Sequence, residues 1–409
     1  MDQTALKILQ LVPQVPYPLS VGGKVGIFNI TKHLAMRGHR ITMLAFDTDS
    51  PVETKPLEQY CELITVPHSN KNSSFRAFVN LFSKLPYNIS KYQSPKFQSR
   101  LCQLLKERRF DIVHVDHLHM AQYGTFSKGK INMPIVLREH NVESVIMERF
   151  ADLSSSFVVR RWLGVQLRRI RSFEAAQAAR YDCCLVITEE DRKRLNTLAP
   201  SARAQVIPGG VEARYFKEPQ RDTRLPVSVS FFGNFDWIPN RDAVLWFVQD
   251  IFPKIITKLP EATLYVIGKN IPPKIKALQS KNLIVRGFVP DLKEEAQKYQ
   301  MTVVPLRVGG GIRLKILESF AMRVPVVSTS VGCEGISGNH NEHLLVGDTA
   351  DEFAEHVVRL LEDEALRKRL VKKAYALAEK KYRWEDIAEQ FEHIYVDVIH
   401  QNKARSQTI

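Results

Sequence analysis

Short apolar runs alternate with helical patterns along almost the whole chain, and this alternation limits the fold more than any other feature. Such runs build βα units, which assemble into parallel sheets with helices on both faces. The predicted strands are residues 7–13, 41–46, 62–66, 111–115, 135–138, 183–188, 205–207, 227–233, 262–268, 283–286, 302–305 and 326–328. We therefore expect an α/β fold with Rossmann-like sheets.

The length of 409 residues exceeds one ordinary hydrophobic core, so two domains are expected. A polar segment with two prolines, residues 214–226, separates two series of βα units. We place the N-terminal domain at residues 1–215 and the C-terminal domain at residues 216–383. Residues 384–409 then form a C-terminal helix and tail.

The composition is that of a globular protein, with 44% hydrophobic residues and a net charge of +14. This charge suits phosphorylated substrates or an anionic membrane surface, whereas the motifs of nucleic-acid-binding modules are missing from the sequence. No apolar run is long enough to span a membrane, and Lys7 and Gln10 interrupt the apolar stretch that would resemble a secretory signal. Five cysteines without a C-x-x-C pair indicate reduced thiols, so we expect a cytoplasmic protein.

Residues 309–311 are three consecutive glycines between a buried strand and a helical segment. A glycine turn of this kind leaves the N–H groups at the helix start open to an anion, at the positive end of the helix dipole. Arg313 and Lys315 add cations within the first turn, and Glu318 lies deeper, where it can accept from a sugar hydroxyl. The pattern predicts a nucleotide-diphosphate site that needs no metal. The alternative is a tight strand-to-helix turn without a ligand.

Two further segments lie at predicted carboxyl ends of strands, where open α/β sheets bind ligands. Gly22 and Gly23 end a proline-rich loop, residues 14–23, before a predicted helix at 25–37. They would let the backbone approach a phosphate or a leaving-group oxygen, unless they only form a turn. His140 follows the strand at 135–138, where it is either a site residue or structural. Glu143 could orient His140 or meet acceptor hydroxyls.

The C-terminal segment resembles the donor-site signature of retaining GT-B glycosyltransferases of family four, the glycosyl transferases of group 1. The family run EAMAxGxPVV is matched by ESFAMRVPVV, which starts at Glu318. The variant GGGxRLKxLE is similar to the subgroup found in bacterial exopolysaccharide assembly. In the N-terminal half, a family run that begins with GG and ends with LAxxGH is matched by Gly22, Gly23, Leu34, Ala35, Arg37, Gly38 and His39.

This resemblance implies the GT-B fold, with two Rossmann-like domains, a central cleft and a C-terminal helix that crosses back to the N-terminal domain. It implies a retaining, metal-independent hexosyltransferase without a cofactor, which moves a sugar from a UDP- or GDP-sugar. The acceptor would be a saccharide or lipid-linked molecule of cell-surface polysaccharide biosynthesis, bound by the N-terminal domain. Two alternatives are a sugar-nucleotide epimerase-like enzyme on the same fold and a catalytically weak binding protein.

The resemblance also implies a set of site residues. His140 would contact the donor sugar, and Lys315 and Arg313 would stabilise the leaving diphosphate. The implied donor-binding residues are Gly22, Gly23, Asn234, Asn240, Phe288, Val289, Gly310, Gly311, Ile312, Leu317 and Glu318. Asn234 and Asn240 stand near the positions where the family has Arg and Lys, and Gly310 replaces the first glutamate of the family's Glu-x7-Glu pair. Lys315 is therefore expected to supply the missing charge.

Two segments contain possible metal ligands, but we expect a metal site at neither. His114, His117 and His119 with Asp116 contain ligand-type side chains, but this spacing at a strand end does not ensure that they converge. The segment from Asp47 to Asp49 matches the D-x-D motif of GT-A glycosyltransferases, which have one nucleotide domain rather than two; such pairs are common by chance.

Residues 157–173 contain five arginines and no acidic residue. On a helix, one stripe is apolar and the opposite stripe is basic: Val159, Leu163, Ile170 and Phe173 against Arg160, Arg161, Arg168 and Arg171. A membrane-surface helix has this pattern, and so has a helix that packs on its own domain with a solvated basic face. Residues 75–86 are a second apolar and basic stretch with the same two interpretations. The inner face of the plasma membrane is therefore one place where this protein could bind.

Overall fold

The computed structural model describes residues 5–19, 22–47, 54–153, 157–217 and 224–407. The chain divides into two compact units, which are described separately. Unit 1 comprises Met1–Pro208 and Glu385–Ile409, and unit 2 comprises Gly209–Trp384. The sequence analysis placed this boundary a few residues later, at 215/216. The expected α/β fold with two Rossmann-like domains is confirmed.

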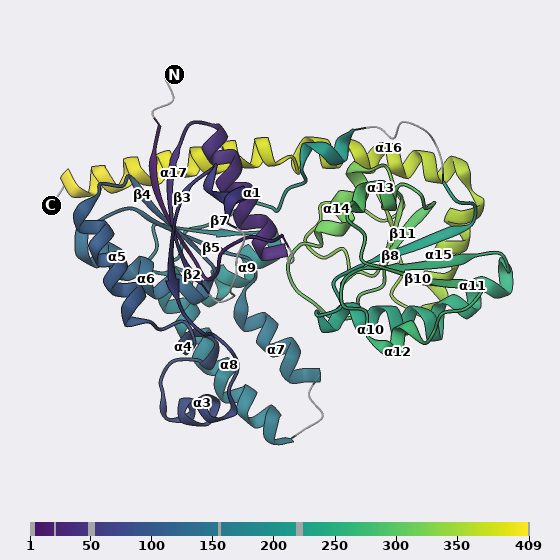
Figure 1. The fold of residues 1–409 in the computed structure, drawn as a ribbon, viewed down its shortest axis with the longest axis horizontal. Helices are drawn as coiled ribbons and strands as arrows, with labels where there is room; N and C mark the ends of the chain where they lie inside the picture. The colour runs from purple at the N-terminus through teal and green to yellow at the C-terminus, as the bar shows by residue number, and fades with distance from the viewer. Residues whose placement is uncertain (1–4, 20–21, 48–53, 154–156, 218–223, 408–409) are drawn as a thin grey trace. The chain divides into compact units, whose positions relative to one another are not determined.

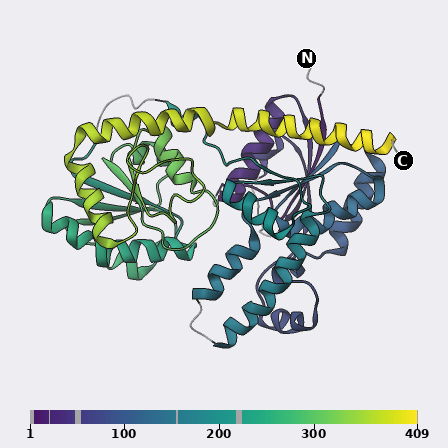
Figure 2. The same ribbon diagram turned by 180° about the vertical axis from the view of Figure 1, so that it is seen from behind.

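Unit 1 is built around a seven-stranded parallel sheet with the order β3-β2-β1-β4-β5-β6-β7 (Figure 1). Its strands are β1 Lys7–Val12, β2 Arg40–Asp47, β3 Glu62–Pro67, β4 Ile112–Asp116, β5 Ile135–Glu139, β6 Cys183–Val186 and β7 Ala204–Val206. All residues of β4, β5 and β6 are buried, because helices lie on both sides of the sheet (Figure 2).

The helices of unit 1 are α1 Gly22–Met36, α2 Lys55–Glu58, α3 Ser74–Val79, α4 Tyr87–Ser90, α5 Pro95–Glu107, α6 Ala121–Ile131, α7 Glu143–Leu153, α8 Phe157–Ala178 and α9 Glu189–Leu198. Two 3-10 turns, η1 Asn80–Phe82 and η2 Leu118–Met120, follow α3 and precede α6. The predicted start of the first helix at residue 25 was wrong, because the helix begins at Gly22. Gly22 and Gly23 therefore lie in the first helical turn rather than in the loop.

Unit 2 contains a six-stranded parallel sheet with the order β10-β9-β8-β11-β12-β13. Its strands are β8 Ser228–Phe232, β9 Thr263–Ile267, β10 Leu283–Gly287, β11 Met301–Val304, β12 Val326–Ser328 and β13 Leu345–Val346. Its helices are α10 Ile238–Trp246, α11 Phe252–Lys258, α12 Pro273–Lys276, α13 Leu292–Ala296, α14 Leu314–Ala321, α15 Ala350–Glu362 and α16 Glu364–Lys381; η4 Phe247–Ile251 joins α10 to α11, and the 3-10 turn η3 Ala213–Phe216 precedes the sheet. The sequence analysis did not predict β13, which has only two residues and carries little pattern.

The C-terminal helix α17, Trp384–Gln407, packs on unit 1 from Glu385 onward, as the resemblance implied. Arg37 at the end of α1 donates to the carboxylate of Glu392 at 2.7 Å. The hydroxyl of Tyr395 forms a hydrogen bond with the ring of His114 on β4. The end of the chain therefore supports the strands that carry the N-terminal site residues.

Two sequence predictions concern features outside the sheets. Asp49 of the D-x-D segment lies outside the described residues. Within the part of the chain that the structure describes, no helix is long and apolar enough to cross a membrane.

Candidate functional site

Each sheet has one point at which the strand order reverses, and several predicted site residues follow the strands at these two points: Gly22 and Gly23 in unit 1, and Asn234 and the glycine-rich loop in unit 2. In unit 1, β1 and β4 are neighbours, so the chain builds outward from them in both directions. In unit 2, β8 and β11 hold the same position. Open parallel sheets bind ligands outside the carboxyl ends of the strands at such a switch point. The loops after these four strands are therefore the structural setting of the candidate sites.

In unit 2, the glycine-rich loop leads from β11 into α14. Gly309 and Gly311 have φ angles of 151° and 70°, which a residue with a side chain adopts only with strain. A Cβ atom at Gly309 would also lie 3.1 Å from the ring of Trp237. The helix begins at Leu314, with Arg313 as its N-cap residue. The glycines thus form the approach to the helix, and Arg313 lies just before the first turn in which it was expected.

The side chain of Arg313 folds back onto this loop and is buried. Its guanidinium donates to the carbonyl oxygens of Gly310, at 2.5 Å, and of Gly311, and to that of Val331 at 3.2 Å. These contacts fix the shape of the loop. A direct contact between Arg313 and a diphosphate stays a prediction.

The ammonium group of Lys315 reaches from the first turn of α14 to the carboxyl end of β8. It donates to the carbonyl oxygen of Phe232 and, at 3.1 Å, to the side-chain oxygen of Asn240. The amide of Asn240 in turn donates to the carbonyl oxygen of Asn234 at 2.8 Å. The structure therefore brings together Lys315, Asn240 and Asn234, although Lys315 and Asn240 are 75 positions apart in the sequence.

Lys315 and Glu318 both have pKa values near neutrality. Burial lowers the pKa of Lys315 to about 7, and the positive charge of Arg313 adds to this effect. Burial raises the pKa of Glu318 to about 7, although the charge of Arg214 opposes the change. A bound diphosphate would favour the charged form of Lys315, and a hydroxyl donor would favour the charged form of Glu318. Perturbed titrating groups of this kind are typical of functional sites.

The other predicted donor residues differ in what they can contact. Phe288 follows β10 at the same edge of the sheet; its side chain is 59% exposed, and the ammonium of Lys269 lies 4.5 Å from its ring centroid. Val289 and Ile312 are partly buried against the core of unit 2. The side chain of Leu317 is fully buried in that core, so it can affect a ligand only through the backbone.

In unit 1, the start of α1 lies against two imidazole rings. His117 follows β4 with a φ of 70°, and His140 follows β5. The two rings stack with 3.8 Å between their centroids and 7° between their planes. A Cβ atom at Gly23 would lie 3.3 Å from Nε2 of His117 and 3.9 Å from Nδ1 of His140, so glycine permits this close approach. Gly22 faces open space.

A buried hydrogen-bond network holds the ring of His140 through its Nε2 atom, away from Gly23. Oδ1 of Asp116 lies 3.2 Å from Nε2 of His140 and 3.3 Å from Nη1 of Arg138, and Oδ2 accepts from Gln10 at 2.8 Å. Oδ2 also lies 3.1 Å from Nε2 of His114. Burial alone would raise the pKa of Asp116, but the charge and hydrogen bond of His114, the hydrogen bond of His140 and the charge of Arg138 hold this pKa well below its usual range.

The network fixes which nitrogen of His140 is available. Nε2 lies 3.2 Å from Asp116 and 3.1 Å from Arg138, so it is engaged in either tautomer, and Nδ1 is the nitrogen on the side of Gly23. Burial, with the positive charge of Arg138, lowers the pKa of His140 to about 4. The ring is therefore neutral at pH 7, and it can exchange a hydrogen bond with a hydroxyl without carrying charge.

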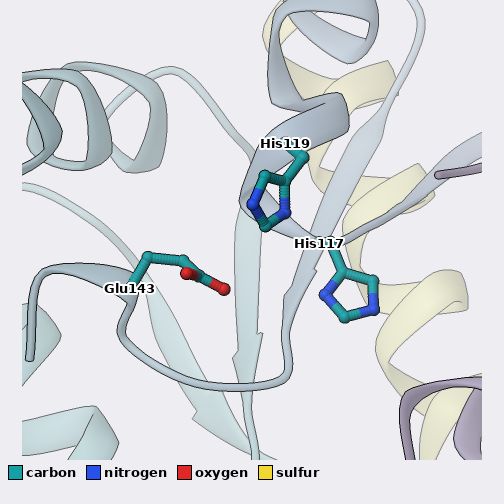
Figure 3. Close-up of side chains that lie close together, drawn as sticks. All are labelled: His117, His119 and Glu143. Atoms are coloured by element: carbon teal, nitrogen blue, oxygen red, sulfur yellow. The ribbon is translucent and has the colours of Figure 1, made fainter. Parts of the chain in front are cut away.

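Figure 3 shows that His117 also belongs to a second group, with His119 and Glu143. Each offers one possible ligand atom, and these atoms lie within 4.8 Å of one another. Two histidines and a glutamate form the ligand set of some catalytic zinc sites. The four possible ligands named from the sequence, His114, Asp116, His117 and His119, do not form one site. His114 and Asp116 belong to the buried network, and only His117 and His119 lie in the second group. Glu143 therefore lies beside His117 and His119, and burial raises its pKa to about 7.

Sequence reasoning missed several residues that shape the two sites. His117 was considered only as a metal ligand, and Arg138 only as part of a strand. Gly268 follows β9, and a Cβ atom there would lie 1.7 Å from the carbonyl oxygen of Gly233. Glycine at a strand end is a signal of close backbone approach, so this pair could have been found from the sequence.

Known families match both halves of the chain. Residues 21–215 match the family described as Glycosyltransferase Family 4, and residues 226–363 match the family described as Glycosyl transferases group 1. N-acetyl-alpha-D-glucosaminyl L-malate synthase of Bacillus anthracis is 32% identical over 416 residues, covering 95% of this chain and 97% of its own length. An uncharacterized 44.6 kDa protein in the cps region of Klebsiella pneumoniae is 23% identical over 391 residues, covering 92% and 96%.

Solved structures share the fold. Sucrose-phosphate synthase of Thermosynechococcus elongatus has a TM-score of 0.75 at 18% identity, with 97% of this chain and 100% of that chain covered. The Anabaena protein HepE in complex with UDP has a TM-score of 0.68 at 14% identity, with 96% and 100% covered. At these identities the likeness shows the fold alone.

Proposed function

The chain belongs to the glycosyltransferases of group 1, with an N-terminal family-four domain, and from this we propose that it is a retaining, metal-independent hexosyltransferase. It is a GT-B glycosyltransferase that uses a sugar nucleotide. The proposal concerns how the sugar is transferred, and to what kind of molecule.

The contacts of Lys315 carry the proposal. Its ammonium lies at the carboxyl end of β8, at the switch point of unit 2, held by Asn240 and by the carbonyl oxygen of Phe232. A leaving diphosphate develops negative charge, and a cation already fixed beside its binding position stabilises that charge without reorganisation. The helix dipole of α14 acts in the same direction. We infer that these groups take the part that a metal ion plays in other glycosyltransferases.

We propose that the sugar is displaced on the face from which the diphosphate leaves, with assistance from the leaving phosphate. No protein nucleophile is required in this scheme. The role of the protein is to orient the donor and to stabilise the charge of the leaving group. Glu318 would accept a hydrogen bond from the ribose, and the neutral ring of His140 would contact the transferred sugar.

We propose UDP- or GDP-sugars as donors and a saccharide or lipid-linked molecule as acceptor, without a further cofactor. HepE, which shares the fold, has been crystallised with UDP. The relative from Klebsiella pneumoniae is encoded in a cps region, which supports a role in cell-surface polysaccharide assembly. The proposed place of action is the cytoplasm, at the inner face of the plasma membrane.

A panel of UDP- and GDP-sugars tests this function. We expect one of them to raise the melting temperature in a thermal-shift screen performed with a metal chelator, because a ligand that binds the folded state stabilises it. The stabilising donor is then incubated with the protein, and its products are analysed. Release of the nucleoside diphosphate with transfer of the sugar supports the proposal. Release of an altered sugar nucleotide indicates an epimerase-like enzyme, and binding without any turnover indicates a binding protein.

A further inference from the structure

The two apolar and basic segments of unit 1 lie side by side in the structure, although about 75 residues separate them in the sequence. η1, which directly follows α3, is hydrogen-bonded to α8 on the part of unit 1 that projects from the sheet (Figures 1 and 2). Arg169 of α8 donates to the carbonyl oxygens of Asn80 and Leu81, each at 2.7 Å. Gln166 donates to the side-chain oxygen of Asn80 at 3.0 Å. These bonds hold the two segments as one surface.

This surface exposes large apolar side chains. Phe75 and Phe82 are 76% and 84% exposed, and Phe157 and Val158 at the start of α8 are 73% and 76% exposed. Phe78 is exposed as well, and its ring contacts that of Phe82. We call these five residues the apolar patch. Soluble proteins rarely gather so many exposed apolar side chains unless the surface binds something.

The charge within the two segments that carry the apolar patch has one sign, although Arg171 of α8 is paired with Glu148 of the neighbouring helix α7 at 2.8 Å. The sequence contains no aspartate or glutamate between Glu62 and Glu107, and none between Asp152 and Glu174. The same segments carry exposed cations, among them Lys84, Arg161 and Arg168. A partner that complements this surface therefore offers an apolar interior to the phenylalanines and negative charge at its own surface to the cations.

We propose that the apolar patch and its surrounding cations bind the surface of an anionic lipid bilayer. The phenylalanines insert into the boundary between headgroups and acyl chains, and the arginines and lysines lie against the lipid phosphates. The deeper part of α8 packs on its own unit instead, because Ile170 is buried there. The sequence alone left both interpretations open for α8, and the structure assigns one to each end of the helix.

The proposal does not depend on the chemistry of sugar transfer, since neither the donor nor the acceptor takes part in it. It would place a lipid-linked acceptor in the same surface to which the enzyme binds. In lipid-free solution, hydrolysis of the donor sugar should be the same in the patch variants as in the wild type. Loss of lipid binding with this hydrolysis retained distinguishes the present proposal from the proposed function.

Vesicle flotation with the full chain tests the proposal. We expect co-flotation with vesicles of phosphatidylcholine and phosphatidylglycerol, little with phosphatidylcholine alone, and a steep decrease with salt. The double variant Phe75→Ser/Phe82→Ser should lose at least ~10-fold of its partitioning, because apolar insertion contributes to binding. Arg161→Glu/Arg168→Glu should lose at least ~10-fold on the anionic vesicles, since each surface cation contributes several-fold.

Two matched variants serve as controls. Met36→Ser removes an apolar side chain that is 66% exposed at the end of α1, and Lys106→Glu reverses an exposed charge on α5. Both should float as the wild type does, and the thermal unfolding of every variant is compared. The proposal is wrong if the wild type binds neither kind of vesicle, or if the patch variants bind as well as the controls. It is also wrong if light scattering shows a wild-type dimer that the phenylalanine variants dissociate, because the patch then joins two copies of the chain.

Discussion

Replacement of Lys315 by alanine is expected to lower turnover at least ~100-fold. The ammonium is held in place by the carbonyl oxygen of Phe232 and the side chain of Asn240, so it is preorganised for the diphosphate. Removal of one preorganised charge-stabilising group typically costs ~2.7–4 kcal/mol in the transition state. Since each ~1.4 kcal/mol is a factor of ten in rate, the expected loss is about 100- to 1000-fold. Added magnesium should not restore turnover.

The pH dependence provides a second, independent readout of Lys315. Burial lowers its pKa to about 7, so the cation is present below that pH and is lost as the pH rises. Burial raises the pKa of Glu318 to about 7, so its carboxylate forms as the pH rises. We therefore expect kcat/KM for the donor to follow a bell-shaped profile with both limbs near neutrality. Lys315→Arg keeps its charge at all these pH values and should remove the falling limb.

The thermal stability of Lys315→Ala should show whether a loss of turnover comes from lost catalysis or from unfolding. The pKa of Lys315 is lower in the folded than in the unfolded protein, so between about pH 7 and 10 the unfolded state binds more protons. This residue therefore favours the folded state more as the pH rises through that window. At and below pH 7 the buried ammonium lowers the free energy of unfolding, because its charge is better solvated in the unfolded state. Lys315→Ala should therefore unfold at the same or a higher temperature than the wild type.

Release of the nucleoside diphosphate, followed over time, is the assay. The matched control is Lys254→Ala, because Lys254 is a half-exposed lysine of unit 2 paired with Asp351 at 2.6 Å. Loss of this surface pair should change stability by no more than ~1 kcal/mol and leave turnover unchanged. Near-normal turnover in Lys315→Ala and in the Arg313/Lys315 double alanine variant would refute this account of the phosphate site.

Three further results are expected. Glu318→Gln should weaken donor binding by ~1.5–3 kcal/mol, the range for a hydrogen bond to a charged group, and an unchanged affinity in calorimetry would sink its assignment to the ribose. His140→Ala should lower turnover strongly while the affinity for the nucleoside diphosphate stays nearly the same; full turnover would make this residue structural. Turnover should survive removal of metals by a chelator, whereas zinc-dependent recovery that His119→Ala abolishes would contradict metal independence.

The fold could be predicted from the sequence because its determinants are local. Buried parallel strands appear as short apolar runs, and the residues that follow them meet at one edge of a sheet. For this reason the glycine-rich loop is predicted as a ligand site from the pattern itself, whereas Asn234 is assigned to that site by the family resemblance. The ammonium of Lys315 contacts Asn240, near the position after β8 where the family has a cation and this chain has none. This contact agrees with the expectation that Lys315 supplies the missing charge.

Other parts of the sites depend on contacts that no local pattern reveals. The bond between His114 and Tyr395 joins positions 281 residues apart, and the support of His140 by Asp116 depends on the packing of several strands. The grouping of Glu143 with His117 and His119 arises from a left-handed turn at His117, which side-chain pattern does not predict. The apolar patch likewise combines two segments that only the hydrogen bonds between η1 and α8 bring together.

The stereochemistry of transfer tests the central claim most directly. The sugar nucleotide that stabilises the protein is incubated with the enzyme and an acceptor in the presence of a chelator, and the anomeric proton of the product is followed by NMR from the first turnover. Our account predicts a product with the anomeric configuration of the donor, formed at the wild-type rate without metal and at least ~100-fold more slowly by Lys315→Ala. An inverted product, or transfer that requires a metal ion, would contradict it.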